Sequence, residues 1–230
     1  MAKREHGSGR DHGHGRGHDK GHEHSRAHSG RCRIIAGRFR GRIIHFDDAE
    51  GLRPTTDRIR ETVFNWLQPN IAGRRCLDAF AGSGALGFEA LSRGASHVTF
   101  VENTRQSVDR LRSNVAELLA DSASQYVDVI HDDVMSWLAG PARQASMVDG
   151  QQATGFDLVF LDPPYRSGLL AECCRRLHDS GCLRPDAIIY VEHAVEDDVA
   201  FPQGWCRIRH KQTASIAYGL YVAGSPGSSS

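Results

Sequence analysis

Two short stretches of the sequence carry residues that could do chemistry, and the first is rich in glycine. Residues 82–87, Gly-Ser-Gly-Ala-Leu-Gly, fit the spacing G-x-G-x-x-G. In an open parallel sheet such a turn lets the backbone approach a ligand closely at the carboxyl ends of the strands. Dehydrogenases and enzymes that use S-adenosylmethionine both have this geometry. The glycines therefore indicate a nucleoside-type cofactor, and their simplest interpretation is only a tight turn between a strand and a helix.

The second stretch, Asp162-Pro163-Pro164-Tyr165, follows an apolar run and favours one of these chemistries. Two consecutive prolines have no N–H, and their carbonyls are left to accept hydrogen bonds from a ligand. An ionised Asp162 is only an acceptor, and Tyr165 offers a flat face on which a base can stack. Together these residues suit a planar group that carries an exocyclic amine. A site for hydride transfer has no use for such an arrangement.

Acidic residues stand at the ends of two further predicted strands. Glu102 follows the glycines by about 20 residues, where a carboxylate can accept from both ribose hydroxyls of a cofactor. Asp132 and Asp133 end the next strand and are placed to meet an adenine ring, although we expect one of the two to be only a helix cap.

The elements that must position these residues alternate along the chain. Apolar runs of strand length that alternate with helical segments predict an α/β fold, here a Rossmann-like, mainly parallel sheet covered by helices on both faces. The predicted strands are 75–80, 97–102, 127–133, 156–162 and 187–193, the predicted helices are 84–92, 104–120, 134–139 and 168–179, and 205–209 with 215–222 form an antiparallel pair that finishes the sheet.

A basic segment precedes this pattern. From Arg31 to Arg42 there are five arginines and no acid, and the apolar stretches on either side of residues 38–40 predict a basic β-hairpin. Within 52–67 the apolar residues recur at helical spacing after candidate caps at 55–57, which predicts an amphipathic helix. We expect these arginines to bind phosphate groups, with a solvated basic face as the simpler interpretation. The candidates are Arg31, Arg33, Arg38, Arg40, Arg42, Arg53, Arg58 and Arg60.

Composition divides the chain into four parts. Residues 1–30 are rich in Gly, His and Arg with seven histidines and almost nothing apolar, so we expect a disordered tail. These histidines could bind nickel or zinc, but we favour a solvated polycation. We expect an N-terminal hairpin and helix over 31–68, a catalytic domain over 69–223 with a polar loop at 140–155, and a frayed end at 224–230.

The composition also excludes some classes of protein. Lysine plus arginine equals aspartate plus glutamate at 28 each, so the net charge indicates no partner. No apolar run reaches the roughly 20 residues of a membrane span, and the N-terminus does not resemble a signal peptide, so we expect a cytoplasmic protein. The six cysteines have no C-x-x-C spacing, and we interpret them as reduced core thiols rather than metal ligands.

Four blocks in order resemble one family. Asp-Pro-Pro-Tyr is similar to the (D/N/S)-P-P-(Y/F) motif of methyltransferases that act on exocyclic nitrogens of nucleobases. The stretches LRPTTDRIRETVFNWL (52–67), LDAFAGSGALGFEALSRGA (77–95), VFLDPPYRSGLL (159–170) and IIYVEH (188–193) resemble the RsmD family, bacterial methyltransferases of guanine N2 in 16S ribosomal RNA. The resemblance covers about residues 33–222. Tyr165 stands where phenylalanine is common, and the tail and the loop 140–155 depart from the pattern.

The resemblance implies a role for each matching residue. S-adenosylmethionine would lie across the strand ends, and no metal would be required. Asp162 and the carbonyl of Pro163 would accept the hydrogens of the guanine amine while Tyr165 stacks on the base. The substrate would be 16S ribosomal RNA within a small subunit or an assembly intermediate, and we expect a monomer. The implied cofactor residues are Asp78 toward the amino group, Ala81, Gly82 and Gly84 at the methionine part, Glu102 at the ribose and Asp133 at the adenine amine.

Other functions fit parts of the sequence. A DNA adenine-N6 or cytosine-N4 methyltransferase carries the same tetrapeptide, but only 68 residues follow Asp162, which leaves little room for a target-recognition segment. A dehydrogenase would explain the glycines alone. A ribosome-assembly or metal-storage protein that kept the fold would explain the His-rich tail, although an intact Asp162 and Tyr165 argue against lost catalysis.

Overall fold

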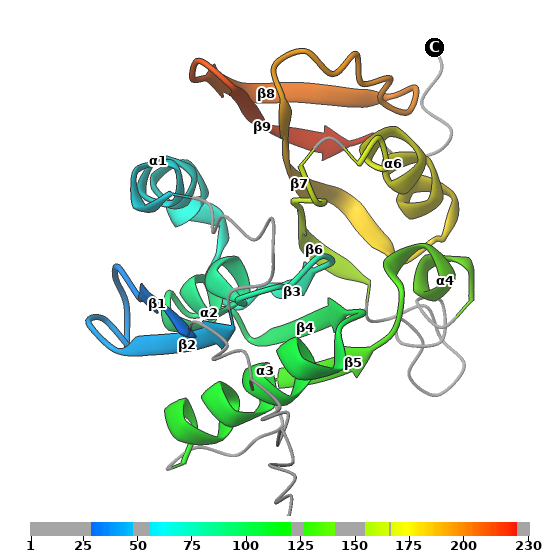
Figure 1. The fold of residues 1–230 in the computed structure, drawn as a ribbon. Helices are drawn as coiled ribbons and strands as arrows, with labels where there is room; N and C mark the ends of the chain where they lie inside the picture. The colour runs from blue at the N-terminus through cyan, green and yellow to red at the C-terminus, as the bar shows by residue number, and fades with distance from the viewer. Residues whose placement is uncertain (1–28, 48–55, 121–126, 141–154, 166, 225–230) are drawn as a thin grey trace, which may run out of the picture.

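The computed structural model describes residues 29–47, 56–120, 127–140, 155–165 and 167–224, which form a sheet with helices on both sides and a small hairpin beside it (Figure 1). The strands are β1 (Ser29–Arg33), β2 (Ile43–Asp47), β3 (Arg75–Asp78), β4 (His97–Glu102), β5 (Val127–His131), β6 (Phe156–Leu161), β7 (Leu183–Ala194), β8 (Trp205–Gln212) and β9 (Ile216–Ala223). The helices are α1 (Asp57–Leu67), a 3-10 turn (Gln68–Asn70), α2 (Ala85–Ser92), α3 (Arg105–Leu118), α4 (Val134–Ala139) and α6 (Leu170–Asp179).

The main sheet has seven strands in the order β5-β4-β3-β6-β7-β9-β8. The pairs β3–β4, β3–β6, β4–β5 and β6–β7 are parallel, and β9 pairs antiparallel with both β7 and β8. This confirms the predicted fold class and the antiparallel pair at its end. The strand order reverses beside β3, so the carboxyl ends of β3, β4 and β6 flank the crevice where ligands bind in such sheets.

Alternating side chains divide the core between the two faces of the sheet. Leu158 and Phe160 of β6 join the cluster that contains α1, α2 and the hairpin, whereas Val159 and Leu161 join the cluster that contains α4 and α6. Strands buried on both faces read as continuous apolar runs, which is why their positions could be predicted.

The N-terminal hairpin is fixed to this body through buried polar side chains. Glu89 of α2 accepts the N–H groups of Ile35 at 2.7 Å and Ala36 at 3.1 Å. Asn114 of α3 accepts from the N–H of His45 at 3.1 Å and donates to its carbonyl at 2.7 Å, as a neighbouring strand would. The hairpin is thus attached directly to α2 and α3 and is part of the same fold.

Several bounds differ from the prediction. Strand β1 begins at Ser29, so that Ser29 and Gly30, which we assigned to the tail, belong to the hairpin. Strand β7 begins at Leu183 and β8 continues to Gln212, beyond the predicted ends at 187 and 209. The rest of the tail, most of the loop 140–155 and the C-terminal end lie outside the described residues.

The six cysteines are free, and Cys206 is the exposed one among them. Burial raises the pKa of the Cys173 thiol to about 12, which leaves it protonated and unreactive. Over the described residues, no helix is long and apolar enough to cross a membrane. The same residues contain no group of three or more His, Cys, Asp or Glu side chains arranged to hold a metal ion.

Candidate cofactor and substrate site

The glycine turn between β3 and α2 forms the first wall of the site. Gly84 is the N-cap of α2 at φ 76°, and Gly82 has φ 48°, both in the left-handed region that favours glycine. A side chain at Gly87 would meet the ring of Phe100 at 2.3 Å, so this glycine permits close packing of α2 on β4. Gly82 and Gly84 thus form the tight turn, and Gly87 the close packing of helix on strand, that the fingerprint predicts, while the approach of the backbone to a ligand stays a prediction.

Asp78 ends β3 directly before this turn. Its Oδ2 accepts the N–H of Gly87 at 2.9 Å, and the residue is 3% exposed. Burial raises the pKa of Asp78 to about 7; the bond from Gly87 opposes this shift, and the negative charge of Glu102 adds to it. A buried carboxyl group with this pKa is suited to meet a cation, since a positive charge would favour its ionised form.

Glu102 joins the turn to the end of β4. Its Oε2 accepts the N–H of Gly82 at 2.9 Å, and its Oε1 accepts the N–H of Thr104 at 2.8 Å. The N–H of Ala81 donates to the carbonyl of Val101 at 3.1 Å. A carboxylate has about four acceptor positions, so these bonds leave Glu102 able to accept from ribose hydroxyls as well.

The acidic pair at the end of β5 contains the expected helix cap. Asp133 is the N-cap of α4, and its Oδ1 accepts the N–H of Ser136 at 3.0 Å. Asp132 accepts the N–H of Asp133 at 2.8 Å. The cap is therefore the residue that the resemblance assigns to the adenine amine, and that assignment stays a prediction.

The Asp-Pro-Pro-Tyr turn leaves β6 at the same edge of the sheet. Asp162 and Pro163 are half-buried, whereas Tyr165 is 51% exposed. The N–H of Ala79 donates to the carbonyl of Phe160 at 3.1 Å and ties the start of the glycine turn to β6. The structure thus brings the glycine turn and the Asp-Pro-Pro-Tyr turn to adjacent strand ends, as the sequence predicted.

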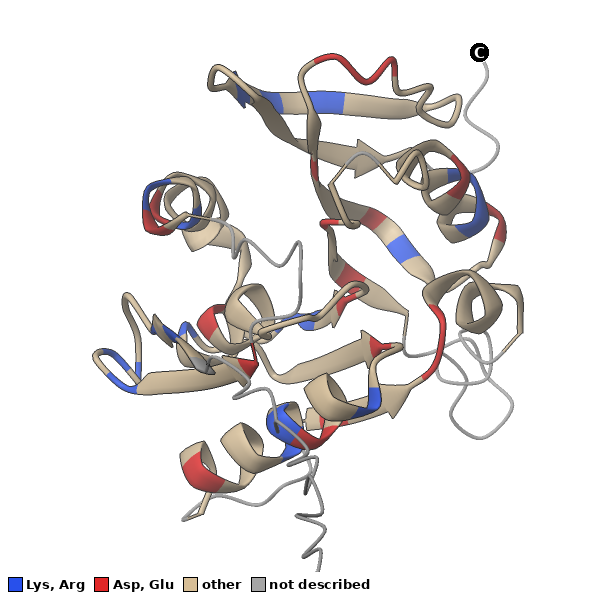
Figure 2. Ribbon diagram, in the orientation of Figure 1, with Lys and Arg blue, Asp and Glu red and all other residues tan. Residues whose placement is uncertain are grey.

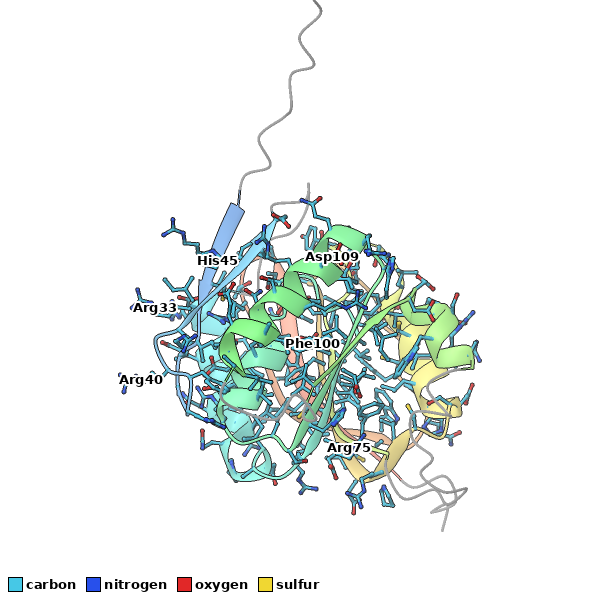
Figure 3. All side chains as sticks on the ribbon, turned by 90° about the horizontal axis from the view of Figure 1, so that it is seen from below. Arg33, Arg40, His45, Arg75, Phe100 and Asp109 are labelled. Atoms are coloured by element: carbon cyan, nitrogen blue, oxygen red, sulfur yellow. The ribbon has the colours of Figure 1, made fainter. Side chains whose placement is uncertain are left out.

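The arginines that we predicted to bind phosphate differ in their exposure to solvent. Arg33, Arg38, Arg40, Arg42 and Arg58 are exposed, and Figure 3 shows Arg33 and Arg40 projecting outward from the hairpin. Arg53 lies outside the described residues.

Arg60 does not fit its expected contact with phosphate. It is fully buried, donates to the carbonyl of Arg33 at 3.0 Å and pairs with Asp57 at 2.6 Å. This side chain joins α1 to the hairpin, since the helical periodicity turns residue 60 inward together with Val63 and Phe64.

Two groups of residues near the site were missed in the sequence. Tyr190 and Glu192 of β7 lie beside Asp162, and β8 carries Arg207, Arg209 and Lys211. The first pair was visible as a polar break in the apolar run 187–193. The basic residues of β8 were hidden because a polar edge strand has no apolar pattern.

A mainly parallel sheet with this strand order, a glycine turn after β3 and an Asp-Pro-Pro-Tyr turn after β6 define a Rossmann-like methyltransferase. A family model described as Conserved hypothetical protein 95 matches residues 32–222. The chain belongs to this family, the RsmD family.

Named relatives and solved structures agree with this family assignment. Ribosomal RNA small subunit methyltransferase D of Escherichia coli K12 is 45% identical over 202 residues, which cover 87% of this chain and 94% of the relative. The protein of the same name from Haemophilus influenzae is 41% identical over 192 residues, 84% of this chain and 94% of the relative. The structure of yhhF from Escherichia coli superposes with a TM-score of 0.71 at 44% identity, covering 85% of this chain and 99% of that one.

Proposed function

We propose that this protein transfers the methyl group of S-adenosylmethionine to the exocyclic N2 amine of a guanine in 16S ribosomal RNA. The observation that carries the proposal is the Asp-Pro-Pro-Tyr turn beside the glycine turn, in a chain that is 45% identical to a ribosomal RNA small subunit methyltransferase. When bound, S-adenosylmethionine supplies a reactive methyl group on a positively charged sulfur.

The residues at the strand ends fit this cofactor. Asp78 and Glu102 are buried acids on either side of the glycine turn, which suits the ammonium group and the ribose hydroxyls of a cationic cofactor. Gly82 and Gly84 bring backbone rather than side chains to the methionine part. Asp78 would pair with the amino group, and Glu102 would hold the ribose.

The substrate residues must correct a weak nucleophile. The lone pair of a guanine amine is delocalised into the ring. Asp162 and the carbonyl of Pro163 would accept its two hydrogens, orient the lone pair toward the methyl group and stabilise the positive charge that develops on nitrogen. Methyl transfer would leave the amine nitrogen positively charged, and an acceptor such as Asp162 would take one of its protons. Tyr165 would stack on the base, and Pro164 would fix the turn.

The structure of the RNA limits which bases can enter. A base must leave its stack to reach Asp162, at a cost of a few kcal/mol, so a loop or a helix junction is a better target than a perfect duplex. Within the proposed function the substrate is a small ribosomal subunit or an assembly intermediate in the cytoplasm, and the enzyme acts as a monomer.

The first experiment is tritium transfer from labelled S-adenosylmethionine to small ribosomal subunits that lack this modification, followed by nucleoside analysis. Label in N2-methylguanosine is expected with the native protein. Asp162→Ala should lower the rate by about 10²-fold or more, because a preorganised acceptor is lost. Label in an adenine derivative would contradict guanine as the target, and label in duplex DNA but not in subunits would instead support the DNA methyltransferase alternative.

A further inference from the structure

A buried acid and a phenol lie beside the Asp-Pro-Pro-Tyr turn, on the neighbouring strand β7. Parallel pairing aligns Leu161 with Val191, so Asp162 and Glu192 follow at the same level. The Tyr190 hydroxyl donates a hydrogen bond of 2.6 Å to Glu192, which is 8% exposed. Burial raises the pKa of Tyr190 well above its ordinary value, and the charges of Glu192 and Asp162 add to the shift, so both carboxylates lie near this hydroxyl.

Two carboxylates around one buried hydroxyl are costly to keep charged, which is typical of functional sites. In the proposed function Asp162 and the Pro163 carbonyl take the amine hydrogens, but the adjacent N1–H of guanine is not assigned to any acceptor. A carboxylate has about four acceptor positions, so Glu192 can accept from Tyr190 and from a base together. We infer that Glu192, oriented by Tyr190, accepts the N1–H of the target guanine and so selects guanine over adenine, an inference that rests on the proposed function.

The test compares the activity of each protein on two different bases, rather than the activities of two proteins on one base. Reconstituted subunits carry either guanine or 2-aminopurine at the mapped target; the analogue keeps the amine, but its N1 is an acceptor that Glu192 would repel. The native protein should prefer guanine by about 10²-fold or more in kcat/KM. In Glu192→Gln, whose amide can donate to N1, this preference should fall at least about tenfold, and Tyr190→Phe should reduce it less.

Partial unfolding of a variant lowers both of its rates by the same factor, so the ratio of the two rates reports on the folded molecules alone. An unchanged ratio in Glu192→Gln would therefore overturn the inference. If the native protein methylates neither substrate, the proposed function has failed instead, and the two failures are distinct.

A second inference comes from the edge strand β8, which carries basic residues on two faces. Directly paired residues of neighbouring strands share a face. Arg207 pairs with Tyr221, which packs in the core with α4 and α6. Arg209 pairs with Leu220, which packs in the opposite core with α1. A bulge between Arg207 and Arg209 causes this change of face, because it adds a residue to the alternation.

Lys211 continues the face of Arg209. It pairs with Tyr218, and its Nζ lies 5.9 Å from the ring centre of Trp66, which in turn stacks on Tyr218 at 5.7 Å. Tyr218 also pairs with Glu192 on β7. These contacts put the basic side chains at the same end of the sheet as Asp162, and Figure 2 shows the basic residues along β8.

Charged residues on an edge strand can serve only to prevent pairing with other chains. A bulge serves that purpose as well, but edge protection does not require that Lys211 lie at the level of Glu192, beside the end of β7. We infer that Arg209 and Lys211 contact phosphates of the RNA whose base enters at Asp162, which again rests on the proposed function. The partner is the RNA backbone, recognised by charge rather than by sequence.

The strand supplies its own matched control, since Arg207 has the same charge on the opposite face. Subunit binding and KM are measured over a salt series for Arg209→Ala/Lys211→Ala, for Arg207→Ala and for the charge-keeping Arg209→Lys/Lys211→Arg. The double alanine variant should lower the slope of log affinity against log salt by about 1.4 to 1.8. Its KM should rise severalfold while kcat stays unchanged, and the two controls should match the native protein.

Equal slopes in the native and double alanine proteins, or an equal loss in Arg207→Ala, would overturn the inference. Aggregation of the double variant with unchanged RNA affinity would assign the charges to edge protection. A native protein that methylates no RNA would count against the proposed function itself.

Discussion

The two basic regions of the molecule look alike in sequence and differ in structure. In the hairpin and α1, Arg60 is fully buried between Asp57 and the carbonyl of Arg33, and the exposed Arg42 donates to the carbonyl of Glu117 at 3.1 Å. On β8, every residue after Trp205 is exposed. A run of arginines in the sequence therefore contains both structural bonds and surface charge. The face that each element turns to the core decides whether an arginine forms a structural bond or contributes surface charge.

The largest effect should come from the buried charge that fixes the hairpin. Glu89→Ala leaves Arg93, which it bonds at 2.7 Å, and two backbone N–H groups without their buried acceptor. Breaking a buried pair costs about 3–5 kcal/mol, so the free energy of unfolding should fall by that amount. Urea unfolding measures it, with the exposed Glu61→Ala as the control. A loss below 1 kcal/mol, on the order of a surface change, would show that the hairpin is not fixed through Glu89.

A smaller loss is expected from Arg60→Ala. Hydrogen bonds to charged groups contribute about 1.5–3 kcal/mol, and Asp57 remains exposed to water when its partner is removed. The neighbouring Arg58→Ala changes an exposed side chain and should stay within about 0.5 kcal/mol of the native protein. If Arg60→Ala keeps full stability but weakens RNA binding, the buried arginine belongs with the surface charges after all.

The acid at the end of β3 extends the comparison to the cofactor. The pKa of Asp78 is raised to about 7, so in the free protein the group is protonated below that pH. It would have to lose this proton to pair, as proposed, with the ammonium group of S-adenosylmethionine. Affinity for S-adenosylmethionine should therefore fall as the pH drops below about 7, by up to about tenfold per unit. Calorimetry between about pH 6 and about pH 8 measures this, and proton release should accompany binding below pH 7. An equal slope in Asp78→Asn would show that another group titrates.

The distinction between side chains that face the core and side chains at the surface also explains which parts of the fold could be predicted from the sequence. The bounds of β4 and α4 match the prediction because buried apolar runs and a capped helix leave a clear periodicity. The start of β7 was missed because Pro185 and Asp186, the latter at φ 60°, interrupt the pattern. The end of β8 was missed because an exposed edge strand has no apolar alternation. The burial of Arg60 could have been read from its place four residues before Phe64 on the apolar face of α1.

The smallest effect per residue is expected where exposed arginines of the hairpin meet RNA. Removing charge at Arg38, Arg40 and Arg42 should weaken subunit binding and leave the affinity for S-adenosylmethionine unchanged, with the salt slope falling by about 0.7 to 0.9 for each phosphate contact that is lost. Equal subunit affinity over the salt series would remove the hairpin from the RNA interface.

Combining this variant with Arg209→Ala/Lys211→Ala sharpens the comparison. If the hairpin and β8 contact separate phosphates of one RNA, the losses of subunit affinity in the two variants should add, because independent sites couple weakly. A combined loss no larger than that of the β8 variant alone would mean that the RNA approaches over the carboxyl end of the sheet and that the hairpin arginines are solvated.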